Sequence, residues 1–74
     1  MGYGSTIRHL REVAGISQKA LAEKLGMPVP RLCERESGNV QMHPEEYHRA
    51  HLAILEIRRE RDAAFEDAMK AATA

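Results

Sequence analysis

The sequence predicts an all-α fold, and three observations lead to that prediction. Apolar residues recur at the three- and four-residue steps of a helix, and the strict alternation of a β-strand does not occur. β-branched and aromatic residues, which favour strands, are scarce. The residues that divide one expected helix from the next all lie in the first part of the chain, and they are Gly15, Gly26, Pro28, Pro30 and Gly38. We therefore expect three short helices followed by one long helix.

The first helix is expected over residues 5–14. It begins near Ser5 and places Ile7, Leu10 and Ala14 on one face at helical spacing. Gly15 follows at the position where a helix C-terminus favours a left-handed residue. These apolar side chains are expected to face the core.

The second helix is expected over residues 18–25, with Leu21, Ala22 and Leu25 buried. Ser17 can cap it by accepting backbone N–H groups of the first turn, and Ile16 can pack on Leu21. Gly26 ends this helix.

A third helix opens at Met27-Pro28. Pro28 and Pro30 lie in its first turn, where the missing N–H groups break no hydrogen bond. This helix is expected to end near Ser37-Gly38-Asn39.

The fourth helix is expected from Pro44 to Ala71, because proline and two acidic residues suit a helix start and no later residue ends it. Residues at alternating steps of three and four resemble a coiled-coil seam. We predict that this seam forms a dimer interface, with its first half also packed on the N-terminal domain. Its members are Tyr47, Ala50, Ile54, Ile57, Arg61, Ala64, Ala68 and Ala71.

Composition limits the class of protein. Seventy-four residues form one small domain, and eleven basic and eleven acidic side chains give a formal charge of zero. Residues 1–42 carry six basic and four acidic side chains, and residues 43–74 carry five and seven. The single cysteine, Cys33, excludes an internal disulfide and indicates a cytoplasmic protein. The longest apolar run, 52–55, is too short for a membrane span, and Met1 begins no apolar leader.

Residues 17–36 carry the most specific pattern, which is SQKALAEKLGM followed by Leu32 and Glu36-Ser37-Gly38. This pattern resembles the phage-repressor/Cro-type (Xre-like, lambda-repressor-like) helix-turn-helix family over residues 7–55. The resemblance implies a lambda-repressor-like helix-turn-helix bundle, a DNA-binding domain at 5–55 continued by a long dimerisation helix at 44–72. It also implies a structural ion pair between Arg11 of the first helix and Glu36 of the third.

The same resemblance implies that the helix at about 28–36 enters the DNA major groove. Its base-facing residues would be Val29, Pro30 and Glu34, with Arg31 and Arg35 nearby. Gln18 and Lys19 would hold a phosphate at the start of the second helix. Ser37 and Asn39 are candidates for a second backbone contact.

We therefore expect a homodimeric transcriptional repressor that binds an inverted-repeat operator in double-stranded DNA. The alternative is a protein-interaction module, such as an antitoxin or antiactivator, that holds a protein partner through the long helix or the Val29-Pro30 surface. No arrangement of catalytic residues is recognisable, so we expect neither an enzyme nor a cofactor. Glu45, His48 and His51 lack a fourth metal ligand, and residues 58–62 are interpreted as a solvated, mixed-charge face.

Overall fold

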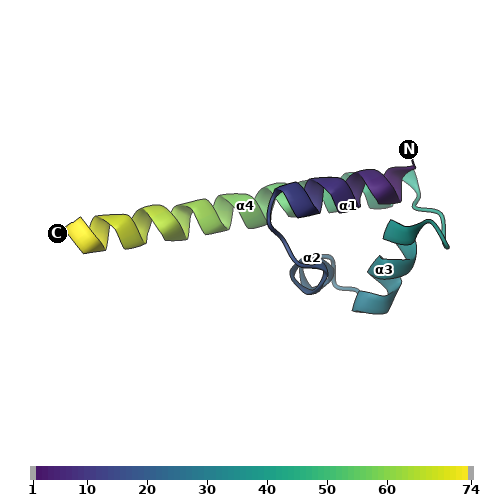
Figure 1. Cartoon of the computed structure of the whole chain (residues 1–74), viewed down its shortest axis with the longest axis horizontal. Coiled ribbons are helices and arrows are strands. Elements are labelled where there is room, and N and C mark those ends of the chain that lie inside the picture. Colours follow the sequence, from purple (N-terminus) through teal and green to yellow (C-terminus); the bar gives the residue numbers. More distant parts are fainter. Residues whose placement is uncertain (1, 74) are drawn as a thin grey trace.

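The structure is a computed structural model that describes residues 2–73. Within this range the chain forms four helices, which are α1 (Tyr3–Val13), α2 (Gln18–Leu25), α3 (Val29–Ser37) and α4 (Pro44–Thr73). The all-α prediction is confirmed for the described residues. Figure 1 shows α1, α2 and α3 gathered beside the first half of α4, while the second half of α4 extends past them.

The helix boundaries follow the local signals of the sequence, with small differences. The α2 range is as predicted, and the Ser17 side chain accepts a 3.0 Å hydrogen bond from the Ala20 amide. Helix α1 begins two residues earlier than predicted, because the Gly2 carbonyl accepts hydrogen bonds from the Thr6 amide and from the Ser5 hydroxyl. Pro28 precedes α3 in an extended conformation and is not part of its first turn.

The core lies where α1, α2 and α3 meet the first half of α4. All ten of its apolar side chains are at most 7% exposed, and they are Ile7, Ile16, Leu21, Ala22, Leu32, Met42, Ala50, Ala53, Ile54 and Ile57. Only Met42 among them comes from the segment between α3 and α4, and its burial in the core was not predicted. Three short helices and one long helix thus share a single core.

Charged side chains in the middle of α4 form hydrogen bonds and ion pairs with the C-terminal ends of α1 and α2. Arg58 and Arg61 donate hydrogen bonds to the carbonyls of Ala14 and Gly15, at 3.4 and 2.9 Å. Arginine suits this place, because the carbonyl end of a helix carries a partial negative charge. Residues 58–62 are all exposed, as expected for a solvated, mixed-charge face, and these two arginines also make the contacts with the end of α1.

Lys24 makes the corresponding contact from α2. Its ammonium lies 2.6 Å from a Glu60 carboxylate oxygen and 3.4 Å from one of Glu56. The hydrogen bond to Glu60 raises the pKa of Lys24 above its ordinary value, with a further contribution from Glu56. These contacts fix the direction in which α4 leaves the core.

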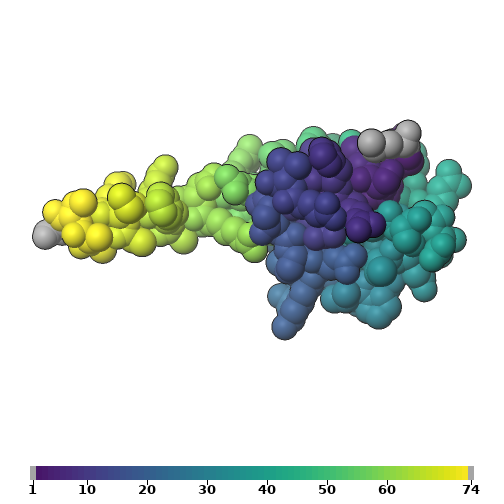
Figure 2. All heavy atoms as spheres, in the orientation of Figure 1, coloured from purple at the N-terminus to yellow at the C-terminus, as the bar shows by residue number. Residues whose placement is uncertain are grey.

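Residues 62–73 of α4 form an overhang, by which we mean the part of the helix beyond the last contact with α1 or α2. At 1.5 Å per residue the overhang is about 18 Å long. Every residue of the overhang is exposed, and Figure 2 shows it standing clear of the body of the molecule. Within residues 2–73, no helix combines the length and the apolar character needed to cross a membrane.

Candidate nucleic-acid interface

Helices α2 and α3 are joined by a tight turn that the sequence encodes locally. Gly26 adopts a left-handed conformation with φ 69°, and its amide donates to the Glu23 carbonyl at 3.1 Å. The Met27 amide donates to the Ala22 carbonyl at 3.0 Å. A side chain at position 26 would strain this backbone, whereas glycine adopts it freely. The turn therefore directs the chain from α2 into Pro28 and α3.

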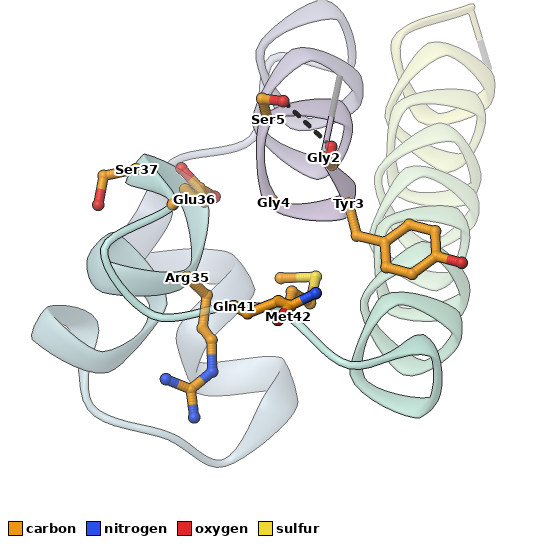
Figure 3. A pocket seen from close by; sticks show the side chains of 10 residues that line it. Gly2, Tyr3, Gly4, Ser5, Arg35, Glu36, Ser37, Gln41 and Met42 are labelled. Atoms are coloured by element: carbon orange, nitrogen blue, oxygen red, sulfur yellow. Dashed lines mark hydrogen bonds between the residues drawn. The ribbon is translucent and has the colours of Figure 1, made fainter.

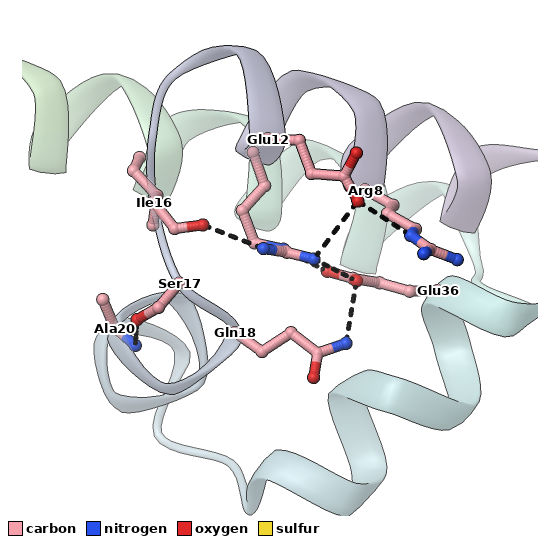
Figure 4. Close-up of polar contacts among 8 residues, drawn as sticks. Arg8, Glu12, Ile16, Ser17, Gln18, Ala20 and Glu36 are labelled. Atoms are coloured by element: carbon pink, nitrogen blue, oxygen red, sulfur yellow. Dashed lines mark hydrogen bonds and ion pairs between the residues drawn. The ribbon is translucent and has the colours of Figure 1, made fainter.

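A buried polar network holds α3 against α1 and α2, as Figure 4 shows. Arg11 donates two hydrogen bonds of 2.9 Å to the two carboxylate oxygens of Glu36. A third, of 2.8 Å, goes from Arg11 to the Ile16 carbonyl. The Glu36 side chain is 2% exposed and that of Arg11 is 10% exposed. The predicted pair is therefore present, and it joins α1 to the C-terminal part of α3.

Gln18 belongs to the same network. Its amide nitrogen donates to the Glu36 carboxylate at 3.1 Å, and the residue is partly buried. Gln18 was predicted to bind a DNA phosphate, and in the structure its side chain contacts Glu36. Its neighbour Lys19 is exposed.

A close backbone approach between α1 and α3 was not predicted. A Cβ atom at Gly4 would lie 1.8 Å from the Arg35 carbonyl oxygen and 2.8 Å from its carbonyl carbon. Only glycine allows these two helices to come so near. Figure 3 shows Gly4 facing the end of α3 beside a hollow that Tyr3, Gln41 and Met42 also line. A glycine inside an otherwise helical segment was the available sequence signal.

The exposed side of α3 carries all three predicted base-facing residues together with Arg31. Val29, Pro30, Arg31 and Glu34 are all exposed. The Ser37 hydroxyl is occupied locally, because it donates to the Glu34 carbonyl at 3.1 Å. It also accepts a 3.4 Å hydrogen bond from the amide of Asn39, which follows the helix.

Arg35 does not belong to this surface. Its guanidinium lies 3.0 Å from a Glu46 carboxylate oxygen, and its side chain is 14% exposed. The other Glu46 oxygen accepts from the His43 amide at 3.2 Å, so Glu46 also caps α4. Burial alone would raise the pKa of Glu46, but the His43 amide and the Arg35 guanidinium together hold that pKa below its ordinary value. Arg35 therefore links α3 to α4, and its guanidinium is already paired within the chain.

Two cations remain at this surface without an acidic partner among residues 2–73, namely Lys19 on α2 and Arg31 on α3. Arg8 of α1 is exposed but lies 2.9 Å from Glu12, and this hydrogen bond lowers the pKa of the Glu12 carboxyl. On α2 and α3, the positive charge without an acidic partner is therefore limited to these two side chains.

The predicted dimer seam divides at the edge of the core. Ala50, Ile54 and Ile57 are at most 7% exposed and pack against the other helices of the same chain. Tyr47 stacks on Tyr3, with ring centroids 4.7 Å apart. The predicted packing of the first half of the seam on the N-terminal domain is therefore confirmed, with Tyr47 partly buried, and the contact with a second copy stays a prediction. Arg61 contacts the Gly15 carbonyl in the turn after α1, and the exposed continuation of the seam is Ala64, Ala68 and Ala71.

Comparisons of the chain with protein-family models, with curated proteins and with solved structures found no match.

Proposed function

We propose that the chain is a sequence-specific DNA-binding transcriptional regulator of the lambda-repressor-like helix-turn-helix type, acting as a homodimeric repressor. The observation that supports this proposal best is the way α3 is held. Its inner side is fixed by Glu36 and by the close approach of Gly4, while its outer side stays exposed. A rigid helix with a free outer face is what insertion into the major groove requires.

The exposed side chains suit contacts with DNA. Arg31 can bind the O6 and N7 atoms of guanine or a phosphate, and Glu34 can accept from the N4 amino group of cytosine. Val29 and Pro30 can contact a thymine methyl group. Lys19, at the start of α2, can bind a backbone phosphate and so set the position of the helix.

The small number of unpaired cations predicts modest affinity. With Lys19 and Arg31 each neutralising one phosphate, two copies would contact four phosphates, and log K would fall with log salt with a slope of about −3.6. One copy would bind weakly, so recognition requires a second copy on an adjacent half-site.

The experiment starts with a selection from random duplex DNA at low salt, followed by fluorescence anisotropy on the selected sequence. We expect Arg31→Ala and Lys19→Ala each to weaken binding, with the salt slope reduced by about 1.8 per dimer when a phosphate contact is lost. Arg59→Ala is the matched control, because Arg59 is an exposed arginine on α4 whose side chain pairs with no carboxylate among residues 2–73. Binding that falls equally in all three variants, or no binding at all, would contradict the proposal.

A second candidate function is a protein-interaction module such as an antitoxin or antiactivator. The exposed apolar side chains of α4 favour it, since Phe65 and Met69 are 67% and 52% exposed. This function predicts a complex that can be rebuilt from the two purified proteins and is abolished by Phe65→Glu but unaffected by Arg31→Ala. Repression by the DNA mechanism predicts a strong requirement for Arg31.

A further inference from the structure

A second stripe runs along α4, rotated away from the face that packs in the core. Its members recur at alternating steps of four and three, the spacing of a coiled-coil seam. We call it the outer stripe, and it consists of His51, Leu55, Arg58, Asp62, Phe65 and Met69. All six residues are exposed. The long helix thus has two seams, one covered in its first half by its own chain and one uncovered along its whole length.

The first half of the outer stripe forms a wall of a groove between α1 and α4. The groove is mainly apolar, and its lining residues are Leu10, Val13, Ala14, His51, Ile54, Leu55 and Arg58. Val13 is 73% exposed, which is unusual for a branched apolar side chain on a helix. Phe65 follows Leu55 by ten residues on the same helix, about 15 Å along its axis, so it cannot reach the groove of its own chain.

Charge decides how two outer stripes can face each other. Arg58 and Asp62 stand at the middle of the stripe, symmetrically on either side of Glu60. Within one chain they lie 3.5 Å apart, and both stay exposed and can also contact charges of a second copy. In a parallel pair, Arg58 would face Arg58 and Asp62 would face Asp62 within the seam, which is unfavourable. In an antiparallel pair centred on Glu60, Arg58 faces Asp62 of the second copy at both symmetric positions.

The same antiparallel register matches the apolar residues. Counting outward from Glu60, Phe65 falls opposite Leu55 of the second copy, and Met69 falls opposite its His51. Leu55 and His51 both line the groove. One register therefore satisfies the charges and brings the exposed overhang to the exposed groove.

We infer that two copies of the chain associate through antiparallel α4 helices centred on Glu60, each placing Phe65 and Met69 in the α1–α4 groove of the other. This inference rests on the homodimer of the proposed function, but it does not require DNA. The partner is a second copy because the overhang and the groove that it fits belong to the same chain.

Substitutions on the two sides of the contact test this arrangement by sedimentation equilibrium without DNA. Phe65→Glu on the overhang and Val13→Glu on the groove wall are each expected to raise the dimer dissociation constant about a hundredfold, since each contact occurs twice. Ala64→Glu is the matched control, because Ala64 lies about 140° around the helix from the outer stripe. All three sites are exposed, so circular dichroism should show the same helix content and melting.

The direction of the helices is tested by a distance between spin labels. The Cys33→Ser substitution first removes the exposed native thiol. Ala72→Cys in that background then carries one spin label per chain. The antiparallel pair separates the two labels by about 36 Å along the axis, whereas a parallel pair brings them to about 10 Å. A distance near 10 Å would overturn the inference.

The oligomer measurement separates this inference from the proposed function. A protein that remains a monomer at high concentration would overturn the inference, as would a dimer that Ala64→Glu dissociates and Phe65→Glu does not. Specific DNA binding by such a protein would still support recognition by α3. Conversely, an antiparallel dimer that binds no DNA would contradict only the proposed regulator.

Discussion

Replacing Glu36 with alanine removes the acceptor of three hydrogen bonds, two of them buried and one partly buried. Two come from Arg11 at 2.9 Å and one comes from Gln18 at 3.1 Å. In the variant, the Arg11 guanidinium stays buried, with the Ile16 carbonyl at 2.8 Å and the nearest remaining carboxylate, that of Glu12, at 4.0 Å.

An uncompensated buried charge of this kind costs about 3–5 kcal/mol of unfolding free energy. Small domains are stable by only about 5–15 kcal/mol in total, so the loss is a large fraction of the stability. At roughly 4–8 °C per kcal/mol for a domain of this size, we expect Tm to fall by at least about 12 °C. Thermal melting followed by circular dichroism measures the change directly.

Glu34→Ala is the matched control, because Glu34 is a carboxylate on the exposed side of the same helix. It should change the unfolding free energy by less than about 0.5 kcal/mol. The double variant Arg11→Met with Glu36→Leu should recover much of the loss, since it leaves no buried charge unpaired. A Glu36→Ala protein that melts with the parent would refute the structural role of the pair.

Three further predictions concern the helix junctions. Gly4→Ala should destabilise the domain by about 1–3 kcal/mol or more in urea titration, because its Cβ would meet the Arg35 carbonyl, whereas Gly2→Ala, with nothing within 4 Å, should not. Ser17→Ala should cost about 1 kcal/mol by the same measurement through loss of the α2 cap, and an unchanged midpoint would contradict it. Because the pKa of Glu46 is lower in the folded protein, the contribution of its carboxylate to the free energy of unfolding is present above the unfolded pKa and is lost as pH falls. The free energy of unfolding of Glu46→Gln should therefore differ most from that of the parent at neutral pH. A difference that stays constant down to about pH 3 would be inconsistent with this.

Local chemistry made the short helices predictable. Ser17 and Gly26 act through backbone groups a few residues away, so their roles can be read from neighbouring sequence. The Arg11–Glu36 pair was also predicted, but from the family resemblance, since its partners are 25 residues apart. Local signals such as Ser17 and Gly26 therefore predict where each helix begins and ends.

Tertiary partners account for what was missed. An exposed and a buried arginine have the same local sequence signal, so nothing near Arg35 indicated that Glu46 would bind it. The long helix carries two stripes with similar spacing, and spacing alone could not show which one packs inside the chain. The structure resolves this point, because Ala50 and Ile54 are buried while Leu55 and Phe65 are exposed.

Base readout by α3 is tested most directly by repeating the DNA selection with a substituted helix. Glu34→Ala leaves the core intact, because Glu34 is exposed, but it changes one side chain of the proposed reading face. We predict that the wild-type protein selects an inverted repeat and that Glu34→Ala relaxes the preference at one symmetric pair of positions, by about tenfold or more. Identical selected sequences for the two proteins, or no enrichment by the wild type, would contradict recognition of DNA by α3.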